Sequence, residues 1–511
     1  MAMKKLLRLL KSKLPKDYVE YVVILCIFAY AIIFSYFTIA RHYSFDSAAW
    51  DLGYFEQMFW TTVNRGTLFR GTPDPLTPSG YCFGVHFSPI LFLVLPIYAF
   101  CQTTETLLVL QSFVLALGAF PVYWLARDEL NSKVAGATFS LAYLLYPPIH
   151  GVNWFDFHTE AFIPVLFAFT FFYFKKEKWT KYFIFLFLLL SVTESISPMV
   201  ICMAFYGLWS HKGVLFKSMK MKTKDFMKDK VVLISFITII LAVLWLIIAL
   251  RIVYYFNPSR LILRLDRFGP NVPSAILNIL SNPVYALRVM FTPTHSKLFY
   301  IVGLFGPLMF LSFLDPPSLS MATPWIVISL LSATYHYWTP VGFQYPAIGA
   351  SIVFISAIYG IKRMMNYEVH SKRPNGSPNV YINSVNVDLK RILVTIIIVS
   401  VLFSVLMSPL GIDLTIGISG RPSGSLYNET LRGVLRLIPL DASVSTQNNI
   451  FPHLSRRLNV YPYAMPNVEY ILVDKRSSWS SGFIPSNVPH NIPSFDELIS
   501  ELVSNGSIGL L

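Results

Sequence analysis

Three carboxylates stand close together directly after the first long apolar segment of the chain. Asp46, Asp51 and Glu56 lie among aromatic residues that include Trp50 and Tyr54. A carboxylate at a membrane surface is costly to desolvate unless it binds a cation, forms an ion pair or acts as a base. The pattern therefore indicates a catalytic base or a metal ligand at the mouth of a lipid-facing cavity. The alternative is a set of interfacial acids that cap the helix bearing the aromatic residues.

A second polar cluster, Asn153–Glu160, places Asp156, His158 and Glu160 at alternating positions between aromatic residues. Acid, imidazole and acid in this order could bind a divalent cation such as Mg²⁺ or Mn²⁺, or a phosphate with its counter-ion. The alternative is an N-terminal cap, because Thr159 and Glu160 start the next apolar helix. Capping explains the acids but not a histidine flanked by aromatic rings.

Two isolated residues are further candidates for substrate binding. Glu194 lies at the tip of a short apolar hairpin, and an ionisable group at membrane depth is a functional candidate by default. His86 begins a segment that continues Phe87-Ser88-Pro89. The alternatives are simple exposure of Glu194 at the turn and a purely structural role for His86.

Arginines gather in the long loop that follows Phe256. Arg260, Arg264 and Arg267 carry planar guanidinium groups that suit a phosphate or pyrophosphate, and His295 and Lys297 lie further along. The alternative is a solvated loop with a local ion pair. No nucleotide-binding signature is present, so a lipid-borne donor is the natural substrate class for an enzyme on this side of the membrane.

The composition shows which elements must position these residues. Of 511 residues, 54% are hydrophobic and only 13% are charged, whereas soluble domains carry about 25% charged residues. The net charge of +14 does not indicate nucleic-acid binding, because Lys and Arg cluster in short loops between apolar segments. We therefore predict a mainly α-helical, polytopic membrane protein.

Apolar segments long enough for membrane helices recur along the chain, and about eleven are expected to cross. These segments are Tyr21–Ala40, Thr106–Ala126, Val134–Pro147, Ala161–Phe174, Tyr182–Val192, Ile196–Trp209, Val231–Leu250, Leu298–Leu314, Ser318–Tyr335, Val341–Ile361 and Ile392–Leu410. Together they define a transmembrane domain over residues 21–410.

The distribution of basic residues predicts the orientation. Residues 1–20, 175–181, 211–230 and 362–391 are rich in Lys and Arg, and such loops lie on the cytoplasmic side. The acidic and histidine-containing loops then lie on the opposite side. We therefore expect a multi-pass protein of the cell membrane with a cytoplasmic N-terminus.

The first outer loop, residues 41–105, should contain helices that lie in the membrane interface. The run His86–Cys101 cannot be a full crossing if the later helices are to keep their orientation. Pro89 and Pro96 also fit a broken segment at the membrane surface better than a continuous span.

The last part of the chain, residues 411–511, is much less apolar. It has a helix-like stretch, Tyr427–Leu437, and three short strand-like stretches at Ala442–Ser445, Leu458–Val460 and Tyr470–Val473. This alternation predicts a small α/β domain on the extracytoplasmic side.

Several motifs resemble, in the same order, those of the membrane proteins grouped as domain of unknown function 2079. The matching segments are Trp50–Trp60, His86–Pro89, Leu107–Gln111, Phe155–Glu160 and Pro452–Arg457. The family in turn distantly resembles the GT-C superfamily of membrane glycosyltransferases, which have an acidic first outer loop with juxtamembrane helices and a lipid-phosphate sugar donor.

The resemblance assigns roles to particular residues. It implies that Asp51 is the catalytic base, with Asp46 as the second choice, and that Glu194 occupies a place where many relatives carry Lys or Glu. The chain departs from the family pattern at Glu56, where Asp is frequent, and at Thr159, where Pro is usual.

We therefore expect a GT-C-like glycosyltransferase that moves a sugar from a polyprenyl-phosphate carrier to a glycan, lipid or protein acceptor on the outer face. The second polar cluster would bind a cation or phosphate, and the three arginines would hold the lipid phosphate. Two alternatives are a transporter or flippase, which predicts ionisable residues deep in several helices, and a non-catalytic assembly protein. The latter would tolerate loss of Asp51 and Asp156.

Overall fold

The computed structural model describes residues 18–74, 77–213, 228–258, 265, 267–365, 369–371, 380–382, 388–411, 426–463, 465 and 468–474, and in these the chain is mainly helical. Five helices are long and apolar enough to cross a membrane, and three shorter apolar helices accompany them. The long ones are Tyr18–Tyr43, Thr104–Glu129, Lys230–Phe256, Ala347–Met365 and Leu389–Met407. The helical membrane character is thus confirmed, but eleven full-length spans are not found among the described residues.

The shortfall in long spans has a local cause, because prolines, glycines and polar turns break several of the apolar segments. The segment predicted as Leu298–Leu314, for example, divides after Phe305 at Gly306-Pro307. Proline cannot donate the backbone hydrogen bond that a continuing helix needs. Apolar composition alone therefore overestimated helix length.

The first helices pack closely around a bend. α2 (Tyr18–Tyr43) lies against α5 (Thr104–Leu117), and α6 (Ala119–Glu129) packs against α7 (Lys133–Leu144). Gly118 separates α5 from α6, and a Cβ atom there would lie 2.3 Å from the Tyr143 hydroxyl of α7. Only glycine permits this approach.

The remaining helices complete the bundle. They are α8 (Pro147–Trp154), α9 (Ile163–Lys175), α10 (Trp179–Leu190), α11 (Ser197–Ser210), α13 (Lys230–Phe256), α16 (Thr294–Phe305), α17 (Pro316–Leu319), α18 (Thr323–Leu331), α19 (Ala347–Met365) and α20 (Leu389–Met407). α19 packs against α9 and α6 and is almost entirely buried, whereas α13 and α20 expose many apolar side chains.

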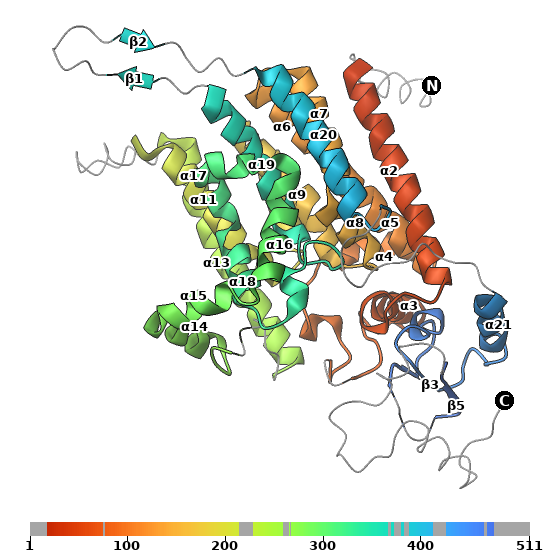
Figure 1. Cartoon of the computed structure of the whole chain (residues 1–511). Helices are drawn as coiled ribbons and strands as arrows, with labels where there is room; N and C mark the ends of the chain where they lie inside the picture. Colours follow the sequence, from red (N-terminus) through yellow and green to blue (C-terminus); the bar gives the residue numbers. More distant parts are fainter. Residues whose placement is uncertain are drawn as a thin grey trace, which may run out of the picture.

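Ion pairs tie the helix ends together at one end of the bundle. Arg127 of α6 pairs with Glu20 of α2 at 2.8 Å, and Lys362 of α19 pairs with Glu129 of α6 at 2.5 Å. The short antiparallel strands β1 (Val369–Ser371) and β2 (Val380–Ile382) extend from this same end (Figure 1). Glu20, Lys176 and Lys362, which are described residues of the segments expected to be cytoplasmic, therefore all pair with charged residues of α6 here.

The opposite end carries the first loop and the last described part of the chain (Figure 1). The first loop contains a π-helical turn, Ala49–Gly53, followed by α3 (Tyr54–Arg65) and α4 (Leu91–Phe100). α4 is apolar, contains Pro96, and exposes Phe92, Leu93 and Ile97. Ten residues of helix rise only about 15 Å, half of a bilayer core, so α4 has the length of a half-span.

Two further helices, α14 (Val272–Ser281) and α15 (Pro283–Met290), also lie at this end, on the far side of the molecule from α21 (Leu426–Leu435) (Figure 1). Both α14 and α15 expose apolar side chains.

Residues 426–474, here called the C-terminal module, form a small α/β unit in the described part of the chain. In its sheet, β3 (Val444–Thr446) lies between β4 (Val460–Tyr461) and β5 (Tyr470–Leu472), and both pairings are parallel. α21 precedes the sheet. The strands occur within or beside the three predicted stretches, because short β-branched and aromatic runs between turns favour strands.

Candidate functional site

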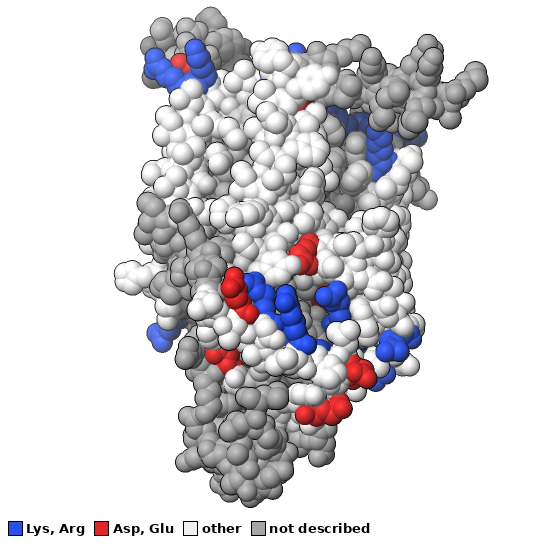
Figure 2. Space-filling model, turned by 90° about the vertical axis from the view of Figure 1, so that its right-hand side faces the viewer, with Lys and Arg blue, Asp and Glu red and all other residues white. Residues whose placement is uncertain are grey.

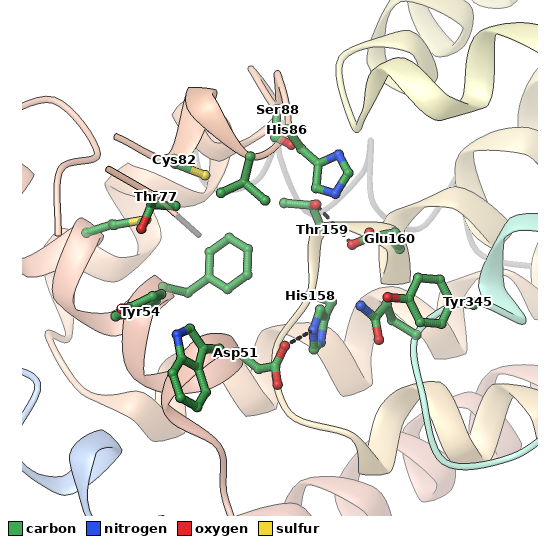
Figure 3. Close-up of a pocket in the computed structure, with 15 residues that line it drawn as sticks. Asp51, Tyr54, Thr77, Cys82, His86, Ser88, His158, Thr159, Glu160 and Tyr345 are labelled. Carbon is green, nitrogen blue, oxygen red and sulfur yellow. Dashed lines mark hydrogen bonds and ion pairs between the residues drawn. The ribbon is translucent and has the colours of Figure 1, made fainter. Parts of the chain in front are cut away.

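A cavity of about 220 Å³ lies between the first loop and the segment that joins α8 to α9 (Figure 3). Its walls carry Asp51, His86, His158, Glu160 and Tyr345. The first loop supplies two of these residues, the α8–α9 segment two more, and the approach to α19 supplies the tyrosine. Residues distant in the sequence therefore meet at one end of the bundle.

A short polar contact in the cavity wall joins Asp51 to His158. The Nε2 atom of His158 lies 2.6 Å from the Asp51 carboxylate (Figure 3). The imidazole is buried, whereas the carboxylate keeps 20% of its side chain exposed. The pair thus presents a carboxylate to the cavity and holds an imidazole behind it.

Electrostatics favour the charged form of this pair. Burial by itself lowers the pKa of His158, but the adjacent Asp51 charge and its hydrogen bond outweigh that effect and raise the pKa to about 9. The imidazole is therefore protonated at neutral pH and donates Nε2–H to Asp51. Its Nδ1 atom is buried with no hydrogen-bond partner among the described residues, and a protonated Nδ1 is a donor for a bound ligand.

The segment that carries His158 is fixed by backbone contacts. The His158 amide donates to Gln111 Oε1 of α5 at 2.8 Å, and the Gln111 side-chain amide donates to the Asp156 carbonyl at 2.5 Å. Asp156 adopts a left-handed backbone conformation with φ of 62°, which Asp tolerates better than most residues. The turn therefore orients the imidazole toward the first loop.

Asp156 links the α8–α9 segment to the end of α2 and to the first loop. Its carboxylate accepts hydrogen bonds from Arg41 Nη1 at 2.7 Å and from the Ala48 amide at 2.7 Å. Both charged side chains are buried, with 7% and 1% exposed. A buried pair of this kind is costly to break, so Asp156 acts as a positioning residue for Asp51 and His158.

A second acid–histidine pair lies on another wall of the cavity. His86 Nδ1 lies 2.7 Å from Glu194 Oε1, and the Phe87 amide donates to Glu194 Oε2 at 3.1 Å. Burial alone would raise the pKa of Glu194, but the charge and hydrogen bond of His86 lower it. Glu194 is thus an ionised, buried anchor, while His86 is the member that faces the cavity.

The C-terminal module supports the first loop on the side away from the cavity. The Asn448 side chain accepts from the Ala49 amide at 2.5 Å, and Gln57 donates to the Arg457 carbonyl at 3.0 Å. A Cβ atom on Gly53 would lie 2.4 Å from Phe451, so only glycine allows this close packing. The turn that carries Asp51 is therefore held between the bundle and the C-terminal module.

Besides Glu194 and Arg267, three predicted site residues lie outside the cavity lining. Asp46 pairs with Arg41 at 3.1 Å and keeps 43% of its side chain exposed. Glu56 is buried in α3 and accepts a hydrogen bond from Tyr98 of α4 at 2.8 Å. Burial raises the pKa of Glu56 to about 7. Asp156, the third, is engaged by Arg41 as described above.

The predicted metal ligands do not converge. Asp156 is bound to Arg41 and His158 to Asp51, while Glu160 faces the cavity beside Thr159. Among the residues that the structure describes, no group of three His, Cys, Asp or Glu side chains could hold a metal ion. The alternating residues Asp156, His158 and Glu160 instead contact different partners.

Of the three predicted phosphate-binding arginines, the structure describes Arg267 alone. Arg260 and Arg264 lie outside the described residues, and Arg267 is exposed. Lys297 is buried, and its ammonium donates to the carbonyls of Val289 and Leu330 at 2.5 Å each. Neither Arg267 nor Lys297 lines the cavity.

Sequence reasoning missed Arg41, Gln111 and Tyr345. Arg41 carried a usable signal, because an arginine at the non-basic end of a membrane helix departs from the usual charge distribution. A glutamine within an apolar helix, as at Gln111, is a similar signal, since a buried amide needs partners. Nothing in the local sequence distinguishes Tyr345.

The apolar helices and the polar cavity at one end of the bundle define a helical membrane protein. The family described as "Predicted membrane protein (DUF2079)" matches residues 41–487, and the chain belongs to this family. The family resemblance of the sequence motifs is thereby confirmed, and the cavity residues all fall in the matched region. No curated protein matches the chain in sequence.

Proposed function

We propose that this protein is a GT-C-like membrane glycosyltransferase that moves a sugar from a polyprenyl-phosphate donor to an acceptor hydroxyl. The observation that carries the proposal is the Asp51–His158 pair in the wall of an aromatic cavity at one end of a membrane bundle. Such a pair provides a carboxylate base next to the plane where a lipid-linked donor lies.

In this mechanism Asp51 accepts the proton of the acceptor hydroxyl as the oxygen attacks the anomeric carbon of the sugar. The bond from that carbon to the phosphate oxygen breaks, and the phosphate leaves with the electron pair on its lipid. The protonated His158 orients Asp51 through its hydrogen bond. Trp50, Tyr54 and Tyr345 line the same cavity and offer apolar faces for the sugar ring.

The charge balance of the cavity supports a sugar in preference to a free phosphate. Asp51 and Glu160 face His158 and His86, and the described lining contains no Lys or Arg. Carboxylates close to an anomeric carbon stabilise the positive charge that develops there during transfer. The lipid phosphate would then bind beside the cavity, not within it.

The proposal places the cavity on the non-cytoplasmic side. The basic segments expected in the cytoplasm meet at the other end of the bundle, where Lys362 and Lys176 pair with acids of α6. Labelling from outside the cell is expected for an engineered cysteine at position 68, where Leu68 of the first loop is 44% exposed, but not for one at position 222. The reverse pattern would contradict this orientation.

The activity is tested with purified protein in lipid nanodiscs, radiolabelled polyprenyl-phosphate sugars and a membrane extract as the source of acceptor. Asp51→Asn should lower label transfer about 10²- to 10⁴-fold, the usual contribution of a general base. Asp46→Asn is the matched control and should remain close to wild type, because Asp46 lies outside the cavity lining. Absence of transfer from every donor, or an Asp51→Asn variant as active as wild type, would refute the proposal.

A further inference from the structure

Two arginines of the C-terminal module lie against the ends of membrane-crossing helices. Arg432 of α21 donates from Nη1 to the carbonyl of Tyr43, the last residue of α2, at 3.3 Å, and its guanidinium lies 5.9 Å from the Tyr43 ring centre. Arg456 donates from Nη1 to the Gln102 carbonyl, just before α5, at 3.1 Å. Both guanidinium groups therefore lie at the level where the bundle ends.

Exposed apolar residues next to these contacts set the depth of the arginines relative to the membrane. Tyr36 of α2 is 67% exposed, and it lies one to two turns before Tyr43, or about 10 Å along the helix. Phe100, 95% exposed at the end of α4, stands two positions before Gln102. Headgroups occupy about 5–8 Å beyond the hydrocarbon core. Arg432 and Arg456 therefore lie at headgroup depth when these apolar faces contact lipid.

The position of α21 leaves room for lipid beside it. Figure 1 shows α21 at the lateral edge of the molecule, next to the end of α2 and outside the outline of the bundle. The face seen in Figure 2 is mostly uncharged in its upper part, and Lys and Arg gather with a few acids in its lower half. The change from apolar to charged surface is the pattern expected at a membrane boundary.

The charges here suit an anionic ligand. Arg436 is exposed on the same segment as Arg432, and Glu105 accepts a hydrogen bond from the Tyr43 hydroxyl. Arg456 Nε lies 3.8 Å from the carboxylate of the buried Glu56, and the Arg456 side chain remains 56% exposed. A guanidinium has five N–H donors, so one bond to a carbonyl leaves others for a phosphate. Arginine forks bind phosphate oxygens in a bidentate manner.

We propose that the C-terminal module binds anionic phospholipid headgroups through Arg432 and Arg456. The headgroups would hold the module against the membrane surface, next to the first loop that it supports. The inference does not depend on glycosyl transfer, since it rests on the membrane boundary and these contacts alone. It assigns a lipid-binding role to residues that lie outside the cavity.

The experiment reconstitutes the full chain in nanodiscs of phosphatidylcholine alone or of an equal mixture with phosphatidylglycerol. Hydrogen exchange of residues 426–463 is followed by mass spectrometry. Phosphatidylglycerol should slow exchange in wild type, and Arg432→Gln with Arg456→Gln should abolish the slowing. The expected size is about fivefold for each arginine, the usual contribution of a basic residue at an anionic surface. Added salt should reduce the effect.

Arg391→Gln is the matched control, because Arg391 is exposed at the other end of the bundle, at the start of α20. It should keep the full effect of phosphatidylglycerol on residues 426–463. Equal exchange in the two lipid mixtures, or a lipid effect that persists in the double variant, would overturn the proposal. Exchange of the α19 amides reports whether the double variant has kept its fold.

Discussion

The two acid–histidine pairs at the cavity have opposite arrangements. In the first, Asp51 faces the cavity with 20% of its side chain exposed, and His158 is buried at 5%. In the second, His86 faces the cavity at 32%, and Glu194 is buried at 1%. The same two chemical groups therefore present a carboxylate from one wall and an imidazole from the other. This difference predicts different consequences when each pair is broken.

Among substitutions of the two histidines, the larger effect is expected from His158→Gln. Glutamine can still donate a hydrogen bond to Asp51, but it removes the positive charge that lies beside this carboxylate. Transfer should fall about 10²-fold, the lower range for a positioned acid–base group. The measurement is the rate of label transfer in nanodiscs.

His86→Gln is the matched comparison, and its transfer rate should fall less than that of His158→Gln. Glutamine there still reaches Glu194, and the first pair stays intact. If the two variants lost the same activity, the distinction between the two walls would be wrong.

Breaking the His86–Glu194 pair should mainly lower the stability of the folded protein. Glu194→Gln removes a charged acceptor for both His86 and the Phe87 amide, and hydrogen bonds to charged groups contribute about 1.5–3 kcal/mol. Because the folded pKa of Glu194 is lowered, this contribution is present above pH 4.5 and is lost as the pH falls through the folded value. The unfolding temperature of Glu194→Gln should therefore lie below that of wild type at neutral pH, and this difference should disappear at acidic pH.

A matched substitution of an exposed glutamate tests whether this difference in unfolding temperature is specific to Glu194. Glu429 is exposed on α21 of the C-terminal module, and Glu429→Gln should leave the unfolding temperature close to wild type. If the unfolding temperature of Glu194→Gln stayed equally far below wild type in acid, Glu194 would not be an ionised, histidine-paired carboxylate.

The first pair should give the opposite pH dependence. His158 has a folded pKa raised to about 9, above its ordinary 6.5. Its contribution to stability is therefore fully present below pH 6.5 and is lost as the pH rises through about 9. Asp51→Asn removes the cause of the shift and should flatten the decline in unfolding temperature between these values. A decline of equal size in the variant would show that other groups cause it.

The smallest effect concerns a buried carboxylate that has no histidine in contact. Burial raises the pKa of Glu56 to about 7, whereas His86 lowers that of Glu194. Glu56→Gln keeps an acceptor for Tyr98 and removes the charge. It should therefore stabilise the fold modestly above pH 7 and have little effect near pH 4, where Glu56 is already protonated. Unfolding temperatures at the two pH values measure the difference.

Much of the architecture could be predicted from composition and motif order. Apolar segments located the long helices, and the charge distribution predicted that the loops of Asp51 and His158 lie on the same side of the membrane. The contact between His86 and Glu194 was not anticipated, since more than 100 residues separate them and only packing brings them together. The spacing of Asp156, His158 and Glu160 misled for a related reason. The left-handed turn at Asp156 sends its carboxylate to Arg41, away from its neighbours in the sequence.

The contacts of Asn448 and Arg457 with the first loop also have a consequence for biosynthesis. A ribosome makes the turn that carries Asp51 about 400 residues before it makes the residues that hold this turn in place. The nascent chain must therefore insert most of its helices while the cavity is still incomplete. A protein cut short before Asn448 would reach the membrane without the residues that hold this turn, so the site is complete only after the C-terminal module has been made.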